Sequence, residues 1–419
     1  MRNSDMAPSM GTPARPNAMR RRELLCRVSS AAACAISPGV LLGQKPASSS
    51  PAPTWREVKP GYVYAFPRDH MSHPEFQTEW WYFTGNLSSG GRPFGYELTF
   101  FRQGRRAAGT QAPTEKGTSV WRTDQLYLAH LALSDIGPQQ FHHAERLNRA
   151  GPGLAGVDAE RGLIWNGNWQ VQLEGQNSWR LRAMDPRFHL DLRLRSSKGP
   201  VIHGRDGMHR KAPGEGRASH YVSLTRLETQ GTLEVQGASF AVQGLSWMDH
   251  EFFSSLLEGG VAGWDWFSLQ LEDGSELMIY QLRLGEAGAA GAPGSVSGGD
   301  FRDNSVGGTY VDGAGGTLDL AQTDIQLRPT GYHRTASGAN YPVEWSILVP
   351  RLKLSMQVKP RMKNQELVSE QSVGPTYWEG AISVEGSRDT RPVAGSGYLE
   401  LTGYAGRVGN PTDTTSAIR

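Results

Sequence analysis

The sequence predicts an all-β protein made of two similar antiparallel β-barrel domains that pack against each other. The chain has 419 residues, which is enough for two domains that each bury a core. Its 51 glycines, 25 prolines and 12 tryptophans, against 20% charged residues, are typical of a turn-rich protein with aromatic strands. Two hairpin patterns also occur twice in the same order, which indicates an internal duplication.

The first repeated pattern is an aromatic strand that runs into a hairpin turn. Residues 80–90 begin at Trp80 and residues 264–274 begin at Trp264, and the aromatic, Phe, Leu and Gly positions of the two segments match. Beyond each turn, a second apolar segment ends on an arginine. Alternating apolar residues around a glycine-containing turn predict a β-hairpin in both places.

The second repeated pattern lies near the C-terminal end of each repeated unit. Residues 231–237 match residues 380–386, with strict apolar and polar alternation in both segments. The strands that follow, 242–249 and 393–400, also align. Two ordered pairs of matches favour a duplication, and chance similarity between unrelated hairpins is the alternative.

The duplication predicts a first domain at residues 58–255 and a second at residues 256–408, connected through residues 252–260. No comparable amphipathic helix is found, and residues 285–299, rich in Gly, Ala and Ser, are expected to form a surface loop. Further segments with strand-like alternation fit the same architecture: 125–133, 169–174, 188–194 and 352–358.

Charge and cysteine content narrow the possible functions. The formal net charge is +2 and the charges are interspersed, so we expect no nucleic acid as a partner. The two cysteines, Cys26 and Cys34, both lie in the N-terminal segment. The folded domains are therefore expected to contain no disulfide and no thiol chemistry.

Residues 1–50 are typical of an export signal followed by a disordered linker. Arg20, Arg21 and Arg22 precede a small and apolar stretch, as in a twin-arginine signal, and a Pro/Ser-rich segment follows. The alternative is a disordered basic tail. We expect a periplasmic or secreted protein without a transmembrane segment in the mature chain, because no later stretch approaches the roughly 20 apolar residues of a spanning helix.

A carboxyl group beside large aromatic residues is the strongest candidate for chemistry. On a strand, Trp247, Asp249 and Glu251 share one face, whereas Met248 and His250 share the other. Burial against tryptophan raises a carboxyl pKa, so that Asp249 could donate a proton near neutral pH, and aromatic faces stabilise a developing cation. Alternatively, the acids pair with arginines and the tryptophans are core residues.

Other candidate site residues surround this strand. His220 with Tyr221 could serve as a catalytic acid/base pair, although an isolated histidine on a strand is more often purely structural. The expected ligand-binding residues combine tryptophans, a tyrosine and two acids from the aromatic clusters: Trp247, Trp80, Trp81, Tyr82, Glu79, Glu251, Trp264 and Trp266.

Several reaction classes lack their sequence signatures. The histidines include no His-Glu-x-x-His motif, and consecutive residues 249–251 alternate faces, so we expect no metal site. The chain contains neither a Gly-x-Ser-x-Gly nor a Ser-x-x-Lys motif, which disfavours serine hydrolase chemistry. No glycine-rich loop opens a helix, so nucleotide binding is unsupported, and we expect no cofactor.

Residues 73–87 and 244–252 resemble the signatures of the AttH-like family, which also includes carotenoid 1,2-hydratases (hydroxyneurosporene synthases) and proteins described as secreted hydrolases. The resemblance covers residues 60–405 and implies two tandem lipocalin-like barrels with a hydrophobic site near their interface. The hydratase pattern of His-x-Trp and Tyr-x-Asp would fall on His220-x-Val222 and Trp247-x-Asp249. The His and the Asp match, whereas the Trp and the Tyr do not.

Together these observations predict an exported lipocalin-like protein that acts on a hydrophobic, isoprenoid-like or lipid-like substrate by acid-assisted hydration or hydrolysis. The alternative is a non-catalytic carrier of a lipophilic molecule in the cell envelope. The expected partner is a hydrophobic small molecule, and an envelope transport system is a further candidate.

Overall fold

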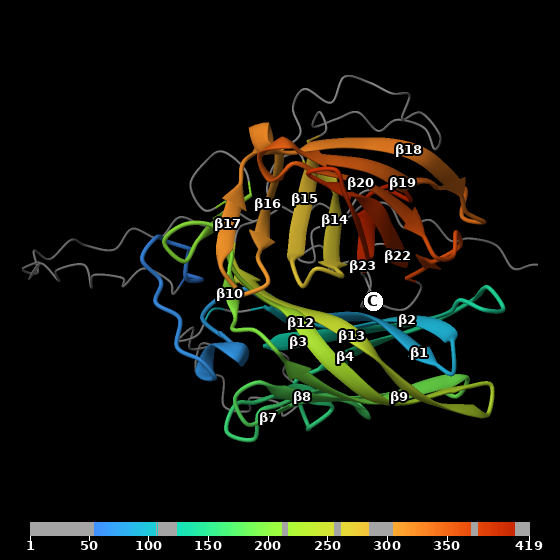
Figure 1. Ribbon diagram of the computed structural model, residues 1–419. Helices are drawn as coiled ribbons and strands as arrows, with labels where there is room; N and C mark the ends of the chain where they lie inside the picture. The colour runs from blue at the N-terminus through green and yellow to red at the C-terminus, as the bar shows by residue number, and fades with distance from the viewer. Residues whose placement is uncertain are drawn as a thin grey trace, which may run out of the picture. The chain divides into compact units, whose positions relative to one another are not determined.

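The computed structural model describes residues 54–105, 107, 124–211, 217–254, 261–284, 305–369 and 376–406 (Figure 1). These residues belong to one unit of the chain, residues 52–419. The expected export segment 1–50 and the expected loop 285–299 lie outside the described residues. Within them, the chain forms strands and three short 3-10 helices, with no α-helix.

The first sheet contains thirteen strands and forms a near-closed barrel. Eleven of them follow the order β4-β3-β2-β1-β13-β12-β9-β8-β7-β6-β5, while β10 and β11 pair with β12. The bounds are β1 Thr78–Ser89, β2 Arg92–Gly104, β3 Gln125–Asp135, β4 Gln140–Arg149, β5 Ala155–Asp158, β6 Leu163–Asn166, β7 Trp169–Glu174, β8 Ser178–Met184, β9 Phe188–Ser196, β10 Val201–Ile202, β11 His209–Arg210, β12 Ala218–Val235 and β13 Ala238–Phe253.

The second sheet contains ten strands in a half-barrel, with the order β17-β16-β15-β14-β23-β22-β20-β19-β18 and β21 paired with β22. Its strands are β14 Val261–Leu271, β15 Glu276–Leu284, β16 Ser305–Val311, β17 Thr317–Leu320, β18 Gln326–Arg334, β19 Asn340–Val349, β20 Leu354–Pro360, β21 Glu366–Leu367, β22 Tyr377–Arg388 and β23 Arg391–Thr402. The 3-10 helices are η1 Arg68–His70, η2 Gln322–Asp324 and η3 Pro350–Leu352. The all-β prediction is confirmed.

The two sheets share one strand topology. Strands β1, β2, β13 and β12 have the same order and direction as β14, β15, β23 and β22. Tyr82 pairs with Asp249 in the first sheet, and Trp266 pairs with Glu400 at the corresponding place in the second. The repeated patterns of the sequence therefore lie on equivalent strands. The domain limits 58–255 and 256–408 stay predictions.

Strand ends differ in detail from the sequence patterns. Phe252 and Phe253 are the last residues of β13 rather than part of a connection, because they continue the pairing with β1. The alternating segment that starts at Leu352 becomes a strand only at Leu354, because η3 occupies Pro350–Leu352. Lys353 between them has a left-handed backbone with φ 51°, which ends the helix.

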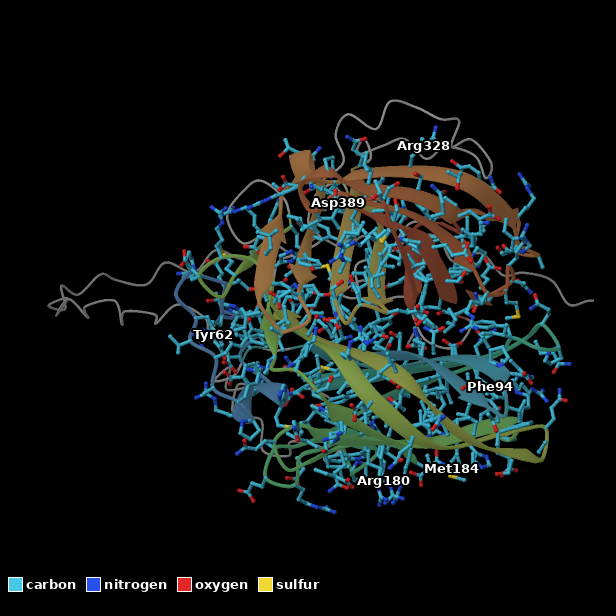
Figure 2. The ribbon with its side chains drawn as sticks, viewed as in Figure 1. Tyr62, Phe94, Arg180, Met184, Arg328 and Asp389 are labelled. Carbon is cyan, nitrogen blue, oxygen red and sulfur yellow. The ribbon has the colours of Figure 1, made fainter. Side chains whose placement is uncertain are left out.

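Each sheet encloses its own apolar core, and a third cluster lies between them. Strand β1 faces β23, and β2 faces β22. Figure 2 shows side chains filling the space between the two sheets. The two sheets approach closely where Gly95 of β2 meets Ala381 of β22, since a Cβ at Gly95 would lie 2.6 Å from the Ala381 Cβ.

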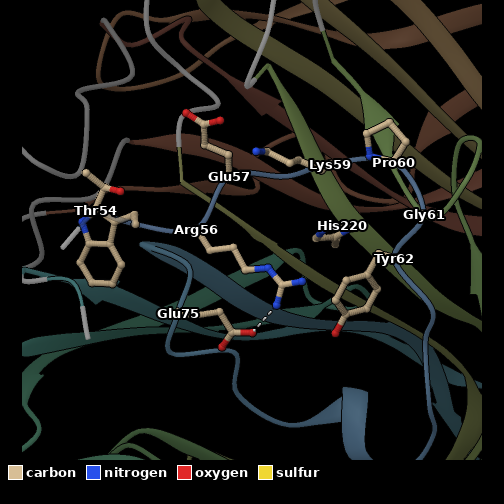
Figure 3. Close-up of a pocket in the computed structure, with 10 residues that line it drawn as sticks. Thr54, Arg56, Glu57, Lys59, Pro60, Gly61, Tyr62, Glu75 and His220 are labelled. Atoms are coloured by element: carbon tan, nitrogen blue, oxygen red, sulfur yellow. Dashed lines mark hydrogen bonds and ion pairs between the residues drawn. The ribbon is translucent and has the colours of Figure 1, made fainter. Parts of the chain in front are cut away.

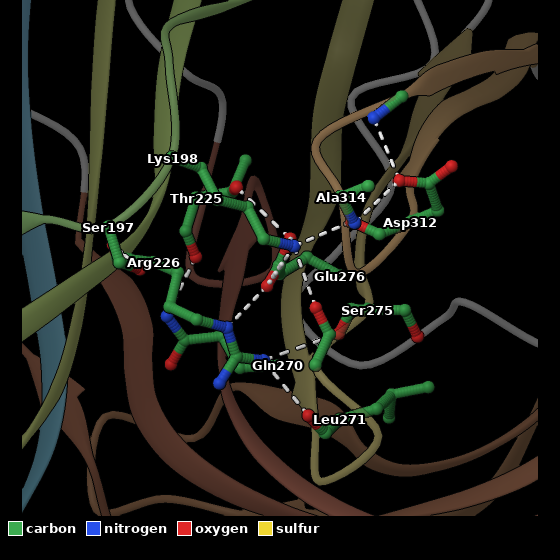
Figure 4. A network of polar contacts seen from close by, with 12 residues as sticks. Ser197, Lys198, Thr225, Arg226, Gln270, Leu271, Ser275, Glu276, Asp312 and Ala314 are labelled. Atoms are coloured by element: carbon green, nitrogen blue, oxygen red, sulfur yellow. Dashed lines mark hydrogen bonds and ion pairs between the residues drawn. The ribbon is translucent and has the colours of Figure 1, made fainter.

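Polar contacts also join the sheets. Glu276 at the start of β15 is fully buried and forms ion pairs with Lys198 at 2.7 Å and Arg226 at 2.5 Å (Figure 4). The side-chain amides of Asn86 and Gln270 donate to backbone carbonyls of the opposite sheet, and these two residues match in the repeat. Buried charges persist only when paired, so Glu276 ties the hairpin between β14 and β15 to the first sheet.

Among the described residues, no helix has the length and hydropathy needed to cross a membrane.

Candidate functional site

Asp249 lies between the two sheets and accepts hydrogen bonds from three side chains. The indole Nε1 of Trp247 donates to Oδ1 at 2.7 Å, and the Tyr221 hydroxyl donates to Oδ2 at 2.6 Å. The Ser223 hydroxyl also donates to Oδ1. Trp266 of the second sheet donates its Nε1 to the Tyr221 hydroxyl at 3.0 Å. Both sheets therefore contribute to the environment of one carboxyl group.

Strand alternation produces this arrangement. On β13, the side chains of Trp247, Asp249 and Glu251 face the second sheet, whereas Met248 and His250 face the first barrel, as the sequence pattern predicts. Asp249 is 4% exposed.

Burial dominates the electrostatics of Asp249. Burial, with a smaller contribution from the Glu251 carboxyl, raises the pKa of this carboxyl from 3.8 to a net value of about 7. The three hydrogen bonds stabilise the ionised form and oppose that rise, because all three groups act as donors. The pKa of Tyr221 lies well above 10, so its hydroxyl keeps its proton. Asp249 therefore exchanges a proton near neutral pH.

A histidine behind Asp249 extends the network. His203 lies 2.7 Å through Nε2 from the Ser223 hydroxyl and 2.8 Å through Nδ1 from the Thr309 hydroxyl of the second sheet. Because Ser223 gives its proton to Asp249, Nε2 of His203 is assigned as the protonated nitrogen. Burial lowers the pKa of His203 to about 3, so the ring is neutral.

Lys211 and Glu251 form an ion pair at the edge of the site. Lys211 Nζ lies 2.7 Å from Glu251 Oε1, which also accepts a hydrogen bond from Ser219. The ammonium group sits 4.6 Å from the centre of the Tyr221 ring and 5.5 Å from that of Tyr280. The sequence patterns gave no sign of Lys211, and they did not single out His203 as a partner of Asp249.

Aromatic side chains form the walls of the site. Tyr82 and Trp266 meet edge to face with ring centres 5.3 Å apart, and Trp247 lies 6.2 Å from Trp266 in the same manner. Trp80 and Trp264 pack against this cluster and stay partly exposed. The structure thus brings these five predicted ligand-binding residues together beside Asp249, Tyr221 and Glu251.

Three more carboxyl groups lie between the sheets. Glu400 accepts a hydrogen bond from Trp264 Nε1 at 2.9 Å, and Glu379 accepts one from the Tyr82 hydroxyl at 2.8 Å. Burial raises the pKa of Glu400 and of Glu97 to about 8 each, and that of Glu379 well above 4.5. Glu400 corresponds to Asp249 in the repeat, whereas the sequence patterns did not single out Glu97 or Glu379. An acid inside an otherwise apolar strand was the available signal for Glu97.

Three predicted site residues, Glu79, Trp81 and His220, lie elsewhere. Glu79 and Trp81 face the interior of the first barrel, because they alternate with Trp80 and Tyr82 on β1. Trp81 stacks on His250 with ring centres 5.0 Å apart. Glu79 is completely buried and is not part of the aromatic site between the sheets.

Glu79 belongs to a charged cluster with His73, His250 and Arg102. Its carboxylate lies 2.9 Å from His73 Nδ1, 2.9 Å from His250 Nε2 and 2.8 Å from Arg102 Nε. Within the part of the chain that the structure describes, His73, Glu79 and His250 are the one group of potential metal ligands, with ligand atoms within 4.8 Å of one another. The buried guanidinium of Arg102 already pairs with this carboxylate, so the residues fit a structural ion cluster better than a cation site.

His220 points away from Asp249, because it neighbours Tyr221 on β12 and therefore occupies the opposite face. Its Nδ1 lies 2.6 Å from the carbonyl oxygen of Gly207, and burial lowers its pKa to about 4. His220 lines a pocket of about 670 Å³ together with Tyr62 and the Arg56–Glu75 ion pair (Figure 3). The structure does not bring His220 and Asp249 into one site.

Comparison with known proteins places this arrangement in a family. The AttH-like family model matches residues 57–404. A crystal structure from Nitrosomonas europaea given the name AttH is 34% identical, with a TM-score of 0.70 over 83% of this chain and 99% of that one. Kievitone hydratase from Nectria haematococca shares the fold at 15% identity, with a TM-score of 0.59 over 84% and 97% of the two chains.

A curated relative adds a weaker match. The dehydratase asqC of Emericella nidulans is 21% identical over 239 residues, which cover 56% of this chain and 64% of the relative. The match therefore spans less than two thirds of that protein. The family match, by contrast, extends over both sheets and includes every strand that supplies the site, so the chain belongs to the AttH-like family.

Proposed function

We propose that this protein is a hydratase-type enzyme that adds water to a carbon–carbon double bond of a hydrophobic substrate, with Asp249 as the acid. The observation that carries the proposal is the buried carboxyl of Asp249, which accepts hydrogen bonds from Trp247 and Tyr221, while Trp266 of the other sheet donates to the Tyr221 hydroxyl. A carboxyl with a pKa of about 7 is matched to proton transfer at neutral pH.

The geometry supports a simple reaction. Asp249 gives its proton to one carbon of the double bond, and the positive charge that develops on the other carbon faces the rings of Trp247 and Trp266. Water then bonds to the cation and loses a proton. The reverse sequence removes water from an alcohol through the same cation, so one site serves hydration or dehydration.

The names of two relatives agree with this reaction class. A hydratase shares the fold, and a dehydratase shares sequence over much of the chain. The aromatic walls around Asp249 favour an apolar, isoprenoid-like or lipid-like substrate. We further propose that the protein works in the cell envelope after export, on the basis of the arginine-rich N-terminal segment.

Replacement of the acid by its amide tests the proposal. The wild-type chain and Asp249→Asn are incubated with kievitone or farnesol in water enriched in oxygen-18, and products are analysed by mass spectrometry. We expect labelled hydrate from the wild type and a loss of about 100-fold or more in the variant, the usual contribution of a general acid. Asp191→Asn, at a partly exposed acid of β9, is the control and should retain activity. Binding of both probes without turnover in any form would instead identify a carrier.

A further inference from the structure

Asp249 and Glu400 occupy equivalent places in the two halves of the repeat. Asp249 pairs with Tyr82 on the neighbouring strand, and Glu400 pairs with Trp266. Each carboxyl accepts a hydrogen bond from an indole of its own sheet, Asp249 from Trp247 at 2.7 Å and Glu400 from Trp264 at 2.9 Å. The duplication has therefore placed a second carboxyl in the surroundings of the first.

The groups that face Glu400 come from both sheets. Across the interface, the carboxyls of Asp249 and Glu251 disfavour its ionised form, and the Lys211 ammonium favours it. Lys211 is already paired with Glu251 at 2.7 Å. Asp249 and Glu400 are therefore coupled, because ionisation of one makes ionisation of the other less favourable.

Two fully buried acids stand behind Glu400. Glu379 pairs with Glu400 between β22 and β23, and Glu97 lies on β2, which packs against β22. Glu379 Oε1, Glu97 Oε2 and the Tyr398 hydroxyl are buried without a hydrogen-bond partner. The Glu400 carboxyl raises the pKa of both Glu97 and Glu379, and the Glu97 carboxyl also raises the pKa of Glu379.

Accessibility separates Glu400 from these two acids. Glu97 and Glu379 are 0% exposed, whereas Glu400 is partly exposed next to Trp264, which is also partly exposed. The attacking water comes from solvent, so the group that takes its proton must be accessible to solvent. Glu400 is therefore the member of this group of acids that is positioned for chemistry.

We propose that Glu400 is the second acid–base residue of the site and removes a proton from the water that attacks the substrate. The reacting form of the coupled pair holds one proton, on Asp249. It is the less populated form, because the pKa of Glu400 is about 8 and that of Asp249 about 7, but it combines the stronger acid with the stronger base. In hydration, Asp249 transfers its proton to carbon, a water oxygen bonds to the neighbouring cationic carbon, and that water releases one proton to the Glu400 carboxylate. The product gains one hydrogen and one hydroxyl. The proton then passes from Glu400 to Asp249, which restores the starting state. This inference rests on the proposed function.

Azide distinguishes a base from a structural residue. Azide anion adds to a cation without losing a proton, so it needs Asp249 but not Glu400. In Glu400→Gln with farnesol or kievitone, we expect hydrate formation to fall at least tenfold, while formation of the azide adduct stays near the wild-type rate. Glu366→Gln changes a buried glutamate at the far side of the second sheet, bonded to Tyr341 at 3.0 Å, and should alter neither product.

The possible outcomes separate the two proposals. Unchanged hydration in Glu400→Gln, together with inactivity of Asp249→Asn, overturns the role of Glu400 alone. An equal loss of hydrate and azide adduct in Glu400→Gln also overturns it, because the residue is then structural. Absence of turnover in the wild type, or full activity of Asp249→Asn, contradicts the proposed function and removes the basis for the inference.

Discussion

The hydroxyl of Tyr221 donates a hydrogen bond to Asp249 at 2.6 Å and so fixes the carboxyl that we propose as the acid. The same hydroxyl accepts a hydrogen bond from Trp266, which belongs to the other sheet. The position of Asp249 thus depends on how the two sheets pack.

Removal of the Tyr221 hydroxyl should raise the pKa of Asp249. The hydroxyl stabilises the ionised carboxyl, so in Tyr221→Phe the carboxyl should hold its proton to higher pH. Infrared difference spectra recorded between pH 5 and 9 would follow the protonated carboxyl. We expect the midpoint to move upward relative to the wild type, and a midpoint that stays or falls contradicts the assigned hydrogen bond. Tyr341→Phe, in the second barrel, is the matched control.

Asp249 should make folding stability depend on pH. Its pKa is about 7 in the folded protein against 3.8 without its environment, so the folded state binds the extra proton between these values. The contribution of Asp249 to the free energy of unfolding is therefore fully present below pH 4 and is lost as the pH rises through 7. It amounts to about 1.4 kcal/mol for each unit by which the folded-state pKa is raised. We expect the difference in unfolding free energy between the wild type and Asp249→Asn to change in this window. Urea titrations at pH 4, 5, 6, 7 and 8 would measure it, and a constant difference would argue against a raised pKa.

Breaking the Lys211–Glu251 pair should destabilise the fold more than removing both partners. Lys211→Met leaves a buried carboxylate unpaired, which costs about 3–5 kcal/mol in comparable buried pairs. The double variant Lys211→Met with Glu251→Gln should recover part of that loss. Chemical denaturation of the two single variants and the double variant measures the coupling. Additive effects would show that the pair contributes little.

Close contact between β2 and β22 predicts a compensating pair of substitutions. Gly95→Ala places a Cβ 2.6 Å from that of Ala381, which forces the sheets apart and should lower the melting temperature. Combining it with Ala381→Gly removes the clashing atom and should restore much of the loss. Thermal unfolding of both single variants and the double variant tests this. Failure of the second substitution to compensate would mean that the sheets do not meet at this point.

Local patterns in the sequence were sufficient for many of the strands and for the internal duplication. Alternation placed Trp247, Asp249 and Glu251 on one face, and matching segments put Glu400 in correspondence with Asp249. These features depend on residues near one another in the chain. Strand alternation and an internal repeat can both be recognised in the sequence without knowing how the strands pack against one another.

Contacts between distant strands could not be read in the same way. Glu97 and Glu379 are nearly three hundred residues apart and meet only because β2 packs on β22. Lys211 reaches Glu251 from a short strand that the patterns did not show. His220 is a different case, because alternation alone would have separated it from Tyr221. The pairing with Asp249 followed the family resemblance instead.

The proton on Asp249 is the central claim, and a carboxyl titration of the intact protein tests it most directly. Carbon-13 NMR of protein labelled at aspartate side-chain carbons, with Asp249→Asn to assign the signal, would give its pKa. We expect a midpoint near pH 7, with the signal absent from the variant. A midpoint near the ordinary aspartate value of 3.8 would contradict the account, because Asp249 would then be ionised at neutral pH and unable to act as the acid.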